Sequence, residues 1–150
     1  MTQDFNVRWG WLKFMYIYTI IGAGGLGLGI VLVPQLVQSV FRFPGQDPVV
    51  FGLLGSTYIA LGLISLLALR APLQFSPILL LQLCLKVIWI IAIAAPLLIS
   101  GELPVHAALL LVIFVTYVIG DFIAIPFPYV FRKEDYLEHT TQQSLEKVKG

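Results

Sequence analysis

The sequence predicts an all-α membrane protein, a four-transmembrane-helix bundle whose N- and C-termini both lie in the cytoplasm. Three observations lead there. Apolar residues make up 59% of the 150 positions and charged residues only 11%, whereas a soluble domain has about 25% charged residues. Four apolar segments each approach the ~20 residues that a helix needs to cross a bilayer. Lysine and arginine residues gather in the connections that fall on one side of such a bundle.

The four predicted spans form a single transmembrane domain, residues 1–131, which is followed by a polar cytoplasmic tail over residues 132–150. Each span is apolar throughout, and charges are confined to the ends and connections with two exceptions discussed below. The spans run over about residues 14–33, 49–69, 78–99 and 105–125.

Helix-capping signals mark the ends of these segments. Asp47-Pro48 and Ser76-Pro77 each place a capping side chain before a proline, which suits the first position of a helix. Pro126 follows the fourth segment and is expected to end it. The expected boundaries therefore agree with the hydropathy.

Orientation follows from the positive charges. With four crossings, both termini and the connection between the second and third spans share one side, and the opposite side holds Arg42 alone. Because positive residues favour the cytoplasm, we expect cytoplasmic termini. The positive residues of the cytoplasmic side are Arg8, Lys13, Arg70, Arg132, Lys133, Lys147 and Lys149.

The segment "PQLVQSVFR", residues 34–42, is too short and too polar to cross. Its apolar residues Leu36, Val37, Val40 and Phe41 recur at helical spacing. It is expected to form either a short amphipathic helix in the outer interface or a kinked extension of the first span.

Small residues mark the helix faces that are expected to pack. In a membrane, helices associate through close contact of small residues and through polar contacts. The first span carries "GAGGLGLG", in which glycines share a face with Tyr18, and Tyr58 shares a glycine face in the second span. The predicted packing positions, within the bundle or in a dimer, are Gly22, Gly25, Gly29, Gly55, Gly62 and Gly120.

Lys86 is the residue that most needs an explanation, because it lies inside the apolar run "LQLCLKVIWII". A charge at mid-membrane costs roughly 2.5–3.5 kcal/mol on insertion scales. Gln82, Lys86 and Trp89 share one helical face, and Tyr117 and Asp121 share a face of the next span. At 1.5 Å per residue, Lys86 lies about 13–14 Å and Asp121 about 15 Å from the cytoplasmic side. We therefore expect them to form an intramembrane pair.

This pair has two interpretations. It could be structural and fix the register of neighbouring helices, or it could belong to a ligand-binding cavity, since intramembrane charges often mark functional sites. In the second case aromatic residues are expected to line the cavity together with the pair. They are Tyr16, Tyr18, Tyr58, Trp89 and Tyr117.

Several function classes are disfavoured. The net charge of +1 gives no reason to expect nucleic acid as a partner, and the single cysteine, Cys84, excludes a disulfide framework. His106 and His139 lie outside the centres of the spans, so we expect neither a metal site nor a haem, and no cofactor. No nucleophile–base arrangement is readable, which favours a non-enzymatic role.

The runs "VPQLVQSVF", "GSTYIALGLISLLALRAP" and "LKVIW" resemble those of small four-helix membrane proteins of the DoxX-like type. The resemblance covers roughly residues 14–125. It implies a compact bacterial four-helix bundle in the inner membrane, sometimes an accessory subunit of a respiratory or redox complex, and it implies no catalytic residues. The Lys86–Asp121 pair is not part of the resemblance.

Two functions are compatible with these features. The first is an accessory or assembly subunit, held together by Lys86 and Asp121, that packs against partner membrane subunits or against itself. The alternative is a binder or carrier of a small hydrophobic molecule (a lipid, a quinone or an isoprenoid) in a cavity around the same two residues. In both cases the surrounding partner is the lipid bilayer.

Overall fold

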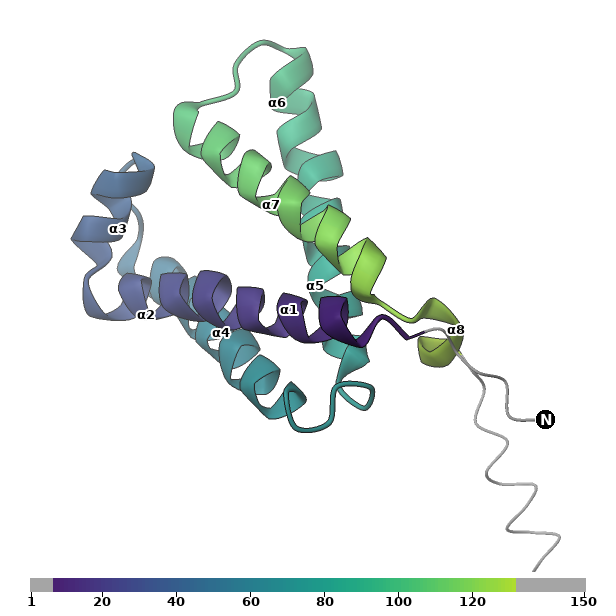
Figure 1. Cartoon of the computed structure of the whole chain (residues 1–150). Helices are drawn as coiled ribbons and strands as arrows, with labels where there is room; N and C mark the ends of the chain where they lie inside the picture. The colour runs from purple at the N-terminus through teal and green to yellow at the C-terminus, as the bar shows by residue number, and fades with distance from the viewer. Residues whose placement is uncertain (1–6, 132–150) are drawn as a thin grey trace, which may run out of the picture.

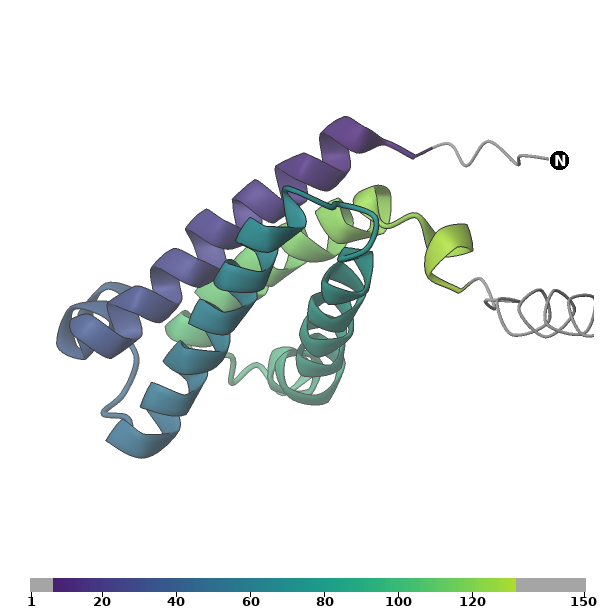
Figure 2. The same ribbon diagram turned by 90° about the horizontal axis from the view of Figure 1, so that it is seen from below.

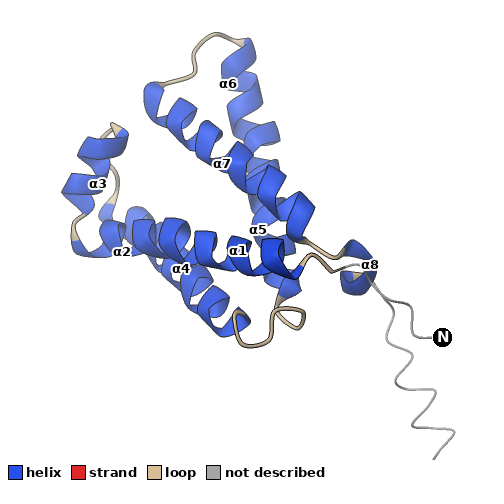
Figure 3. Ribbon diagram, in the orientation of Figure 1, coloured by secondary structure: helices blue, strands red, loops and turns tan. Residues whose placement is uncertain are grey.

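The computed structural model describes residues 7–131, and throughout this range the chain forms helices and connecting loops without a strand (Figure 1, Figure 3). The predicted polar tail, residues 132–150, lies outside the described residues. Four helices are long and apolar enough to cross a membrane, which indicates an integral membrane protein and confirms the predicted number of spans in this part of the chain. They cover Trp9–Leu32, Pro48–Ala68, Ser76–Ile99 and Val105–Ala124.

Two of the four spans are interrupted by a wide, π-helical turn. The first span consists of α1 (Trp9–Thr19), the turn η1 (Ile20–Gly24) and α2 (Gly25–Leu32). The third consists of α5 (Ser76–Trp89), the turn η2 (Ile90–Ala94) and α6 (Ala95–Ile99). The second and fourth spans, α4 (Pro48–Ala68) and α7 (Val105–Ala124), are continuous α-helices.

The segment after the first span forms its own helix, α3 (Pro34–Phe41), and not a kinked extension. Val33 leaves the helical region with φ −137° and ψ 59°, and Arg42 ends α3 in the left-handed conformation with φ 55°. Val37 is buried where α3 folds back, in a cluster with Ile30 of α2 and Phe51 of α4. Beyond α7, Pro126 precedes the short helix α8 (Phe127–Val130).

One of the two predicted caps is confirmed and the other is wrong. Asp47 Oδ1 accepts hydrogen bonds from the backbone N–H groups of Val49 and Val50, both at 3.0 Å. Ser76, by contrast, is itself the first residue of α5, and its hydroxyl donates to the carbonyl of Leu73 at 2.8 Å. The hydroxyl that was expected to cap α5 therefore forms its hydrogen bond within the turn that precedes the helix.

The bundle is closed at one end and open at the other. α1 and α2 pack along α4, while α5 packs on α7, and α1 joins the two pairs by contacting α7. Figure 1 shows α1 and α7 converging toward α8 and diverging toward α3. Figure 2 shows α4 running beside the first span, which consists of α1 and α2. α4 contacts α5, its successor in the chain, only sparsely. The diverging half leaves room for the cavity described below.

Glycines permit the close approach of the first span to α4. A Cβ added to Gly62 would lie 2.8 Å from the Cα of Gly24, and one added to Gly27 would lie 2.7 Å from the carbonyl oxygen of Gly55. Backbone atoms cannot give way as a flexible side chain can, so these positions require glycine. Gly25, which the sequence analysis placed at a packing face, is exposed, and a Cβ added to it would meet no atom within 4 Å beyond its own stretch of helix. The remaining predicted glycines all have close neighbours; they are Gly22, Gly29, Gly55 and Gly120.

The wide turn η2 has a cause in the sequence. Pro96 follows it, and proline has no N–H to donate to the carbonyl four residues earlier, with which its ring also clashes. Widening of the preceding turn relieves that clash. Irregular turns in long helices commonly lie at prolines and at π-bulges. The turn η1 contains no proline and has a different cause, given below.

Candidate functional site

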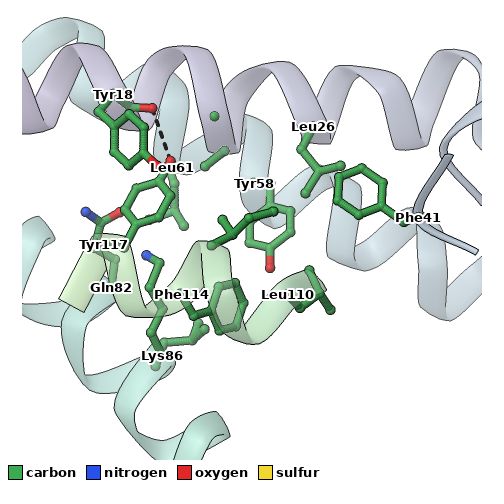
Figure 4. A pocket seen from close by; sticks show the side chains of 14 residues that line it. Tyr18, Leu26, Phe41, Tyr58, Leu61, Gln82, Lys86, Leu110, Phe114 and Tyr117 are labelled. Atoms are coloured by element: carbon green, nitrogen blue, oxygen red, sulfur yellow. Dashed lines mark hydrogen bonds between the residues drawn. The ribbon is translucent and has the colours of Figure 1, made fainter. Parts of the chain in front are cut away.

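A cavity of about 260 Å³ lies between the diverging spans (Figure 4). Its walls come from the first span, α4, α5 and α7, and Phe41 of α3 adds to the lining. Of the described residues around it, Lys86 alone carries a charge, and most of the rest are apolar or aromatic. The lining residues are Tyr18, Gly22, Ala23, Leu26, Phe41, Tyr58, Leu61, Gln82, Leu85, Lys86, Leu110, Ile113, Phe114 and Tyr117.

Lys86 is 5% exposed, and its ammonium group lies against aromatic faces. Nζ is 4.2 Å from the ring centroid of Tyr117 and 6.0 Å from that of Phe114. A cation over an aromatic face is attracted by about 2 kcal/mol when both are desolvated. Within residues 7–131 the structure gives Nζ no hydrogen bond and no ion pair. An ammonium has three N–H donors, so its capacity is largely unused.

A chain of buried polar side chains lies beneath the cavity and links three spans. Gln82 of α5 donates to Asp121 Oδ1 of α7 at 2.9 Å, and its Nε2 lies 3.2 Å from the hydroxyl of Thr19 in α1. Thr19 in turn donates to the carbonyl of Met15 at 2.8 Å. Asp121 is 0% exposed, and its second oxygen, Oδ2, has no partner among the described side chains.

The pairing of Lys86 with Asp121 therefore stays a prediction. The two residues lie on neighbouring helices, and Gln82, one helical turn from Lys86 on α5, donates to Asp121 of α7. In this arrangement, however, Gln82 occupies one oxygen of the carboxyl group and Lys86 is directed to the Tyr117 ring. The second carboxyl oxygen of Asp121 and the ammonium of Lys86 are thus both buried and both able to form further hydrogen bonds.

Tyr117 explains the wide turn η1. Its hydroxyl donates to the backbone carbonyl of Tyr18 at 3.1 Å and lies beside the backbone of Ala23. A group inserted into the hydrogen-bond ladder of a helix is a known cause of local widening. A Cβ on Gly22 would overlap this hydroxyl, so glycine at that position makes room for it.

The predicted aromatic residues are divided between the cavity and its surroundings. Tyr18, Tyr58 and Tyr117 line the cavity. Tyr16 does not; it is buried toward the closed end, where its hydroxyl donates to the carbonyl of Pro72 at 2.7 Å. Trp89 is not part of the lining either, and packs edge-on against Phe114 with ring centroids 5.0 Å apart.

Three positions at the site did not stand out in the sequence. Thr19 lies one residue from Tyr18 in an apolar run, and only its depth could have suggested a buried role. Phe41 belongs to α3 and reaches the cavity because α3 folds back over the bundle. Leu61 supplies apolar wall from α4, and one leucine among many gives no signal.

No family model, curated protein or solved structure matches the chain. The site's own geometry therefore carries the functional argument.

Proposed function

We propose that this protein binds a small hydrophobic molecule within the membrane, in the cavity between its diverging spans. The observation that carries the proposal is the ammonium of Lys86, which is buried at the cavity wall without a hydrogen-bond acceptor in the described chain. A buried charge with unsatisfied donors is unfavourable unless something binds to it. A ligand with an oxygen acceptor would satisfy Lys86 while its apolar part fills the cavity.

The remainder of the lining is suited to such a molecule. Ligand sites are typically apolar concavities in which a few polar groups fix orientation. Here Leu26, Leu61, Leu110 and Ile113 supply apolar surface, and lipid, quinone and isoprenoid molecules all have matching apolar parts. The chain would act as a binder or carrier, with no covalent chemistry assigned to it.

A second candidate role is that of an accessory or assembly subunit, in which Lys86 and Asp121 hold the bundle together. One observation favours it. Gly25 and Gly52 both lie where a Cβ would meet no other helix of the described chain within 4 Å, on helices that otherwise pack through small residues. Outward-facing glycines in membrane helices can accept a helix of a partner subunit or of a second copy.

The cellular setting belongs to the same proposal. The excess of lysine and arginine on one side supports cytoplasmic termini, and the resemblance to DoxX-like proteins supports a bacterial inner membrane location. Relationship to the DoxX-like proteins rests on the sequence pattern described above, and the four-helix arrangement is compatible with it.

Native mass spectrometry of the protein, extracted gently from its own membrane, tests the proposed function. A small molecule bound at fixed stoichiometry is expected for the wild type. Leu110→Trp should expel it by filling the cavity, because Leu110 lines the wall. Leu109→Trp is the matched control, since Leu109 is the neighbouring residue, is 41% exposed and does not line the cavity. A wild-type protein free of small molecules, or a complex with other membrane chains only, would favour the accessory role instead.

A further inference from the structure

The geometry points to a class of ligand: an uncharged planar ring that carries carbonyl oxygens and an aliphatic chain, as an oxidised isoprenoid quinone does. This inference rests on the proposed function, because it specifies what the cavity binds. Three features of the cavity support it: the hydrogen-bonding groups at its wall, the charge around them and its shape.

The polar groups that remain free at the wall are donors. Tyr18 shares a hydrogen bond with Thr116 at 2.9 Å, and the hydroxyl of Tyr117 is used on the Tyr18 carbonyl. The amide of Gln82 is used on Thr19 and Asp121.

Two groups are then left within the described lining, the ammonium of Lys86 and the hydroxyl of Tyr58, for which the structure shows no partner. Figure 4 shows Lys86 reaching into the cavity from α5, and the hydroxyl of Tyr58 pointing across it from α4 toward α7. An ammonium cannot accept a hydrogen bond, and a hydroxyl can donate one. The ligand should therefore present oxygen acceptors.

The charge around the cavity favours a neutral ligand over an anionic one. Lys86 is the charged side chain at the wall, and Asp121 lies behind the wall, where it accepts from Gln82, one helical turn from Lys86. With the carboxyl group ionised, the two side chains together carry no net charge. A fatty-acid carboxylate would add an uncompensated negative charge at mid-membrane depth, which is unfavourable. A carbonyl oxygen accepts from Lys86 without that penalty.

The shape of the cavity favours a ring. Tyr58, Phe114 and Tyr117 supply aromatic faces and edges, against which a planar ring packs well. A volume of about 260 Å³ is at the lower limit of ligand cavities. It suits a ring-sized head group, and the chain would extend past Leu26 and Leu85 toward the lipid. A whole two-chain lipid is too large.

This hydrogen-bonding pattern also distinguishes the two redox forms. The hydroxyl oxygens of the reduced ring can accept from Lys86 as a carbonyl oxygen can, but each hydroxyl also brings a proton that needs an acceptor. Tyr58 can accept one of the two protons, and Lys86 can accept neither. We therefore expect the oxidised ring to bind about tenfold more tightly than the reduced ring, the loss that follows when a buried donor is left without an acceptor.

The test uses the full chain in lipid nanodiscs, stripped of bound molecules, and measures the binding of decylubiquinone, decylubiquinol and oleate by calorimetry. Wild type should bind decylubiquinone at one per chain. Lys86→Met should weaken binding about ten- to a hundredfold, and Tyr58→Phe should weaken it several-fold. Lys13→Met is the matched control, because Lys13 is an exposed lysine on α1, and it should bind as wild type does.

The outcomes separate this inference from the proposed function. Binding of oleate in place of decylubiquinone, abolished by Leu110→Trp, would overturn the ring inference and leave the cavity function standing. Equal affinity for decylubiquinone and decylubiquinol would also overturn it. Binding of none of the three probes, together with a native protein free of small molecules, would overturn both. If Lys86→Met fails to fold, Tyr58→Phe still decides, since an unchanged affinity there contradicts the two-donor arrangement.

Discussion

The hydroxyl of Tyr117 donates to the backbone carbonyl of Tyr18 at 3.1 Å, across the interface between α7 and the first span. The two rings also contact each other, with centroids 4.4 Å apart. This single contact opens the helix at η1 and fixes one wall of the cavity. It also presents the face of the Tyr117 ring to Lys86. The contact between Tyr117 and Tyr18 therefore accounts both for the shape of the cavity and for the wide turn in the helix.

Tyr117→Phe should destabilise the bundle by about 1 kcal/mol, the net contribution of a hydrogen bond of this kind. The ring and its contact with Lys86 would remain, so ligand binding should change little. The measurement is thermal unfolding in detergent. Tyr18→Phe is the control: its hydroxyl bonds Thr116, which keeps its own bond to the carbonyl of Ile113, so a smaller loss is expected. A larger loss in Tyr18→Phe would contradict the role given to Tyr117.

Gly62→Ala should destabilise the protein by about 1–3 kcal/mol, the usual range for an overpacked interior. The added methyl group would meet the Cα of Gly24 at 2.8 Å, so the two helices would have to separate. Gly25→Ala is the matched control, since it also adds a methyl group to a helical glycine. It should be neutral or stabilising by about 0.5–1 kcal/mol, because its surroundings are open. Equal effects in urea or SDS unfolding would show that the helix crossing is placed wrongly.

The difference between these two glycines shows how far sequence reasoning reaches. Hydropathy is a sum over some twenty residues, so it predicted the four spans and most of their boundaries correctly. Face assignments depend on counting along an unbroken α-helix, and the wide turn at η1 interrupts that count. Gly25 was counted onto the same face as Gly22 and Gly29 but does not pack within the bundle, while Gly24 and Gly27 make the close approaches.

The candidate site was predictable in kind but not in detail. A lysine inside a span stands out against hydrocarbon, and periodicity placed Gln82 on its face. The direct partner of Asp121 was less predictable, because an amide and an ammonium one turn apart compete for the same carboxyl group. The packing of several helices decides which of the two groups binds the carboxyl group, and that packing cannot be predicted from a single sequence.

A double-mutant cycle on Lys86 and Asp121 measures whether the two charges are coupled. Lys86→Met alone would leave a buried carboxylate, and Asp121→Asn alone a buried ammonium, each at about 3–5 kcal/mol. The double variant should be closer to wild type than either single variant, which requires a coupling energy of about 3 kcal/mol or more. Equilibrium unfolding of the four proteins gives the value. Single variants as stable as wild type would rule out the pairing.

Asp47→Ala should destabilise α4 by about 1 kcal/mol, because the backbone N–H groups of Val49 and Val50 lose their acceptor. Asp47→Asn keeps a side-chain oxygen in the same place and should be close to wild type. Thermal unfolding distinguishes the two variants. A deficit of equal size in Asp47→Asn would mean that the charge of Asp47, and not its capping geometry, stabilises the start of α4.

Labelling of single cysteines tests the proposed orientation. In a Cys84→Ser background, Gly45→Cys places a thiol in the loop between α3 and α4, and Gln74→Cys places one in the loop between α4 and α5. Both positions are exposed and lie at opposite ends of α4. If positive residues face the cytoplasm, a membrane-impermeant maleimide should label the Gly45→Cys protein on intact cells, and the Gln74→Cys protein only after the membrane is opened. The reverse pattern would place the termini outside and would turn the closed end of the bundle, with its buried polar chain, toward the external face.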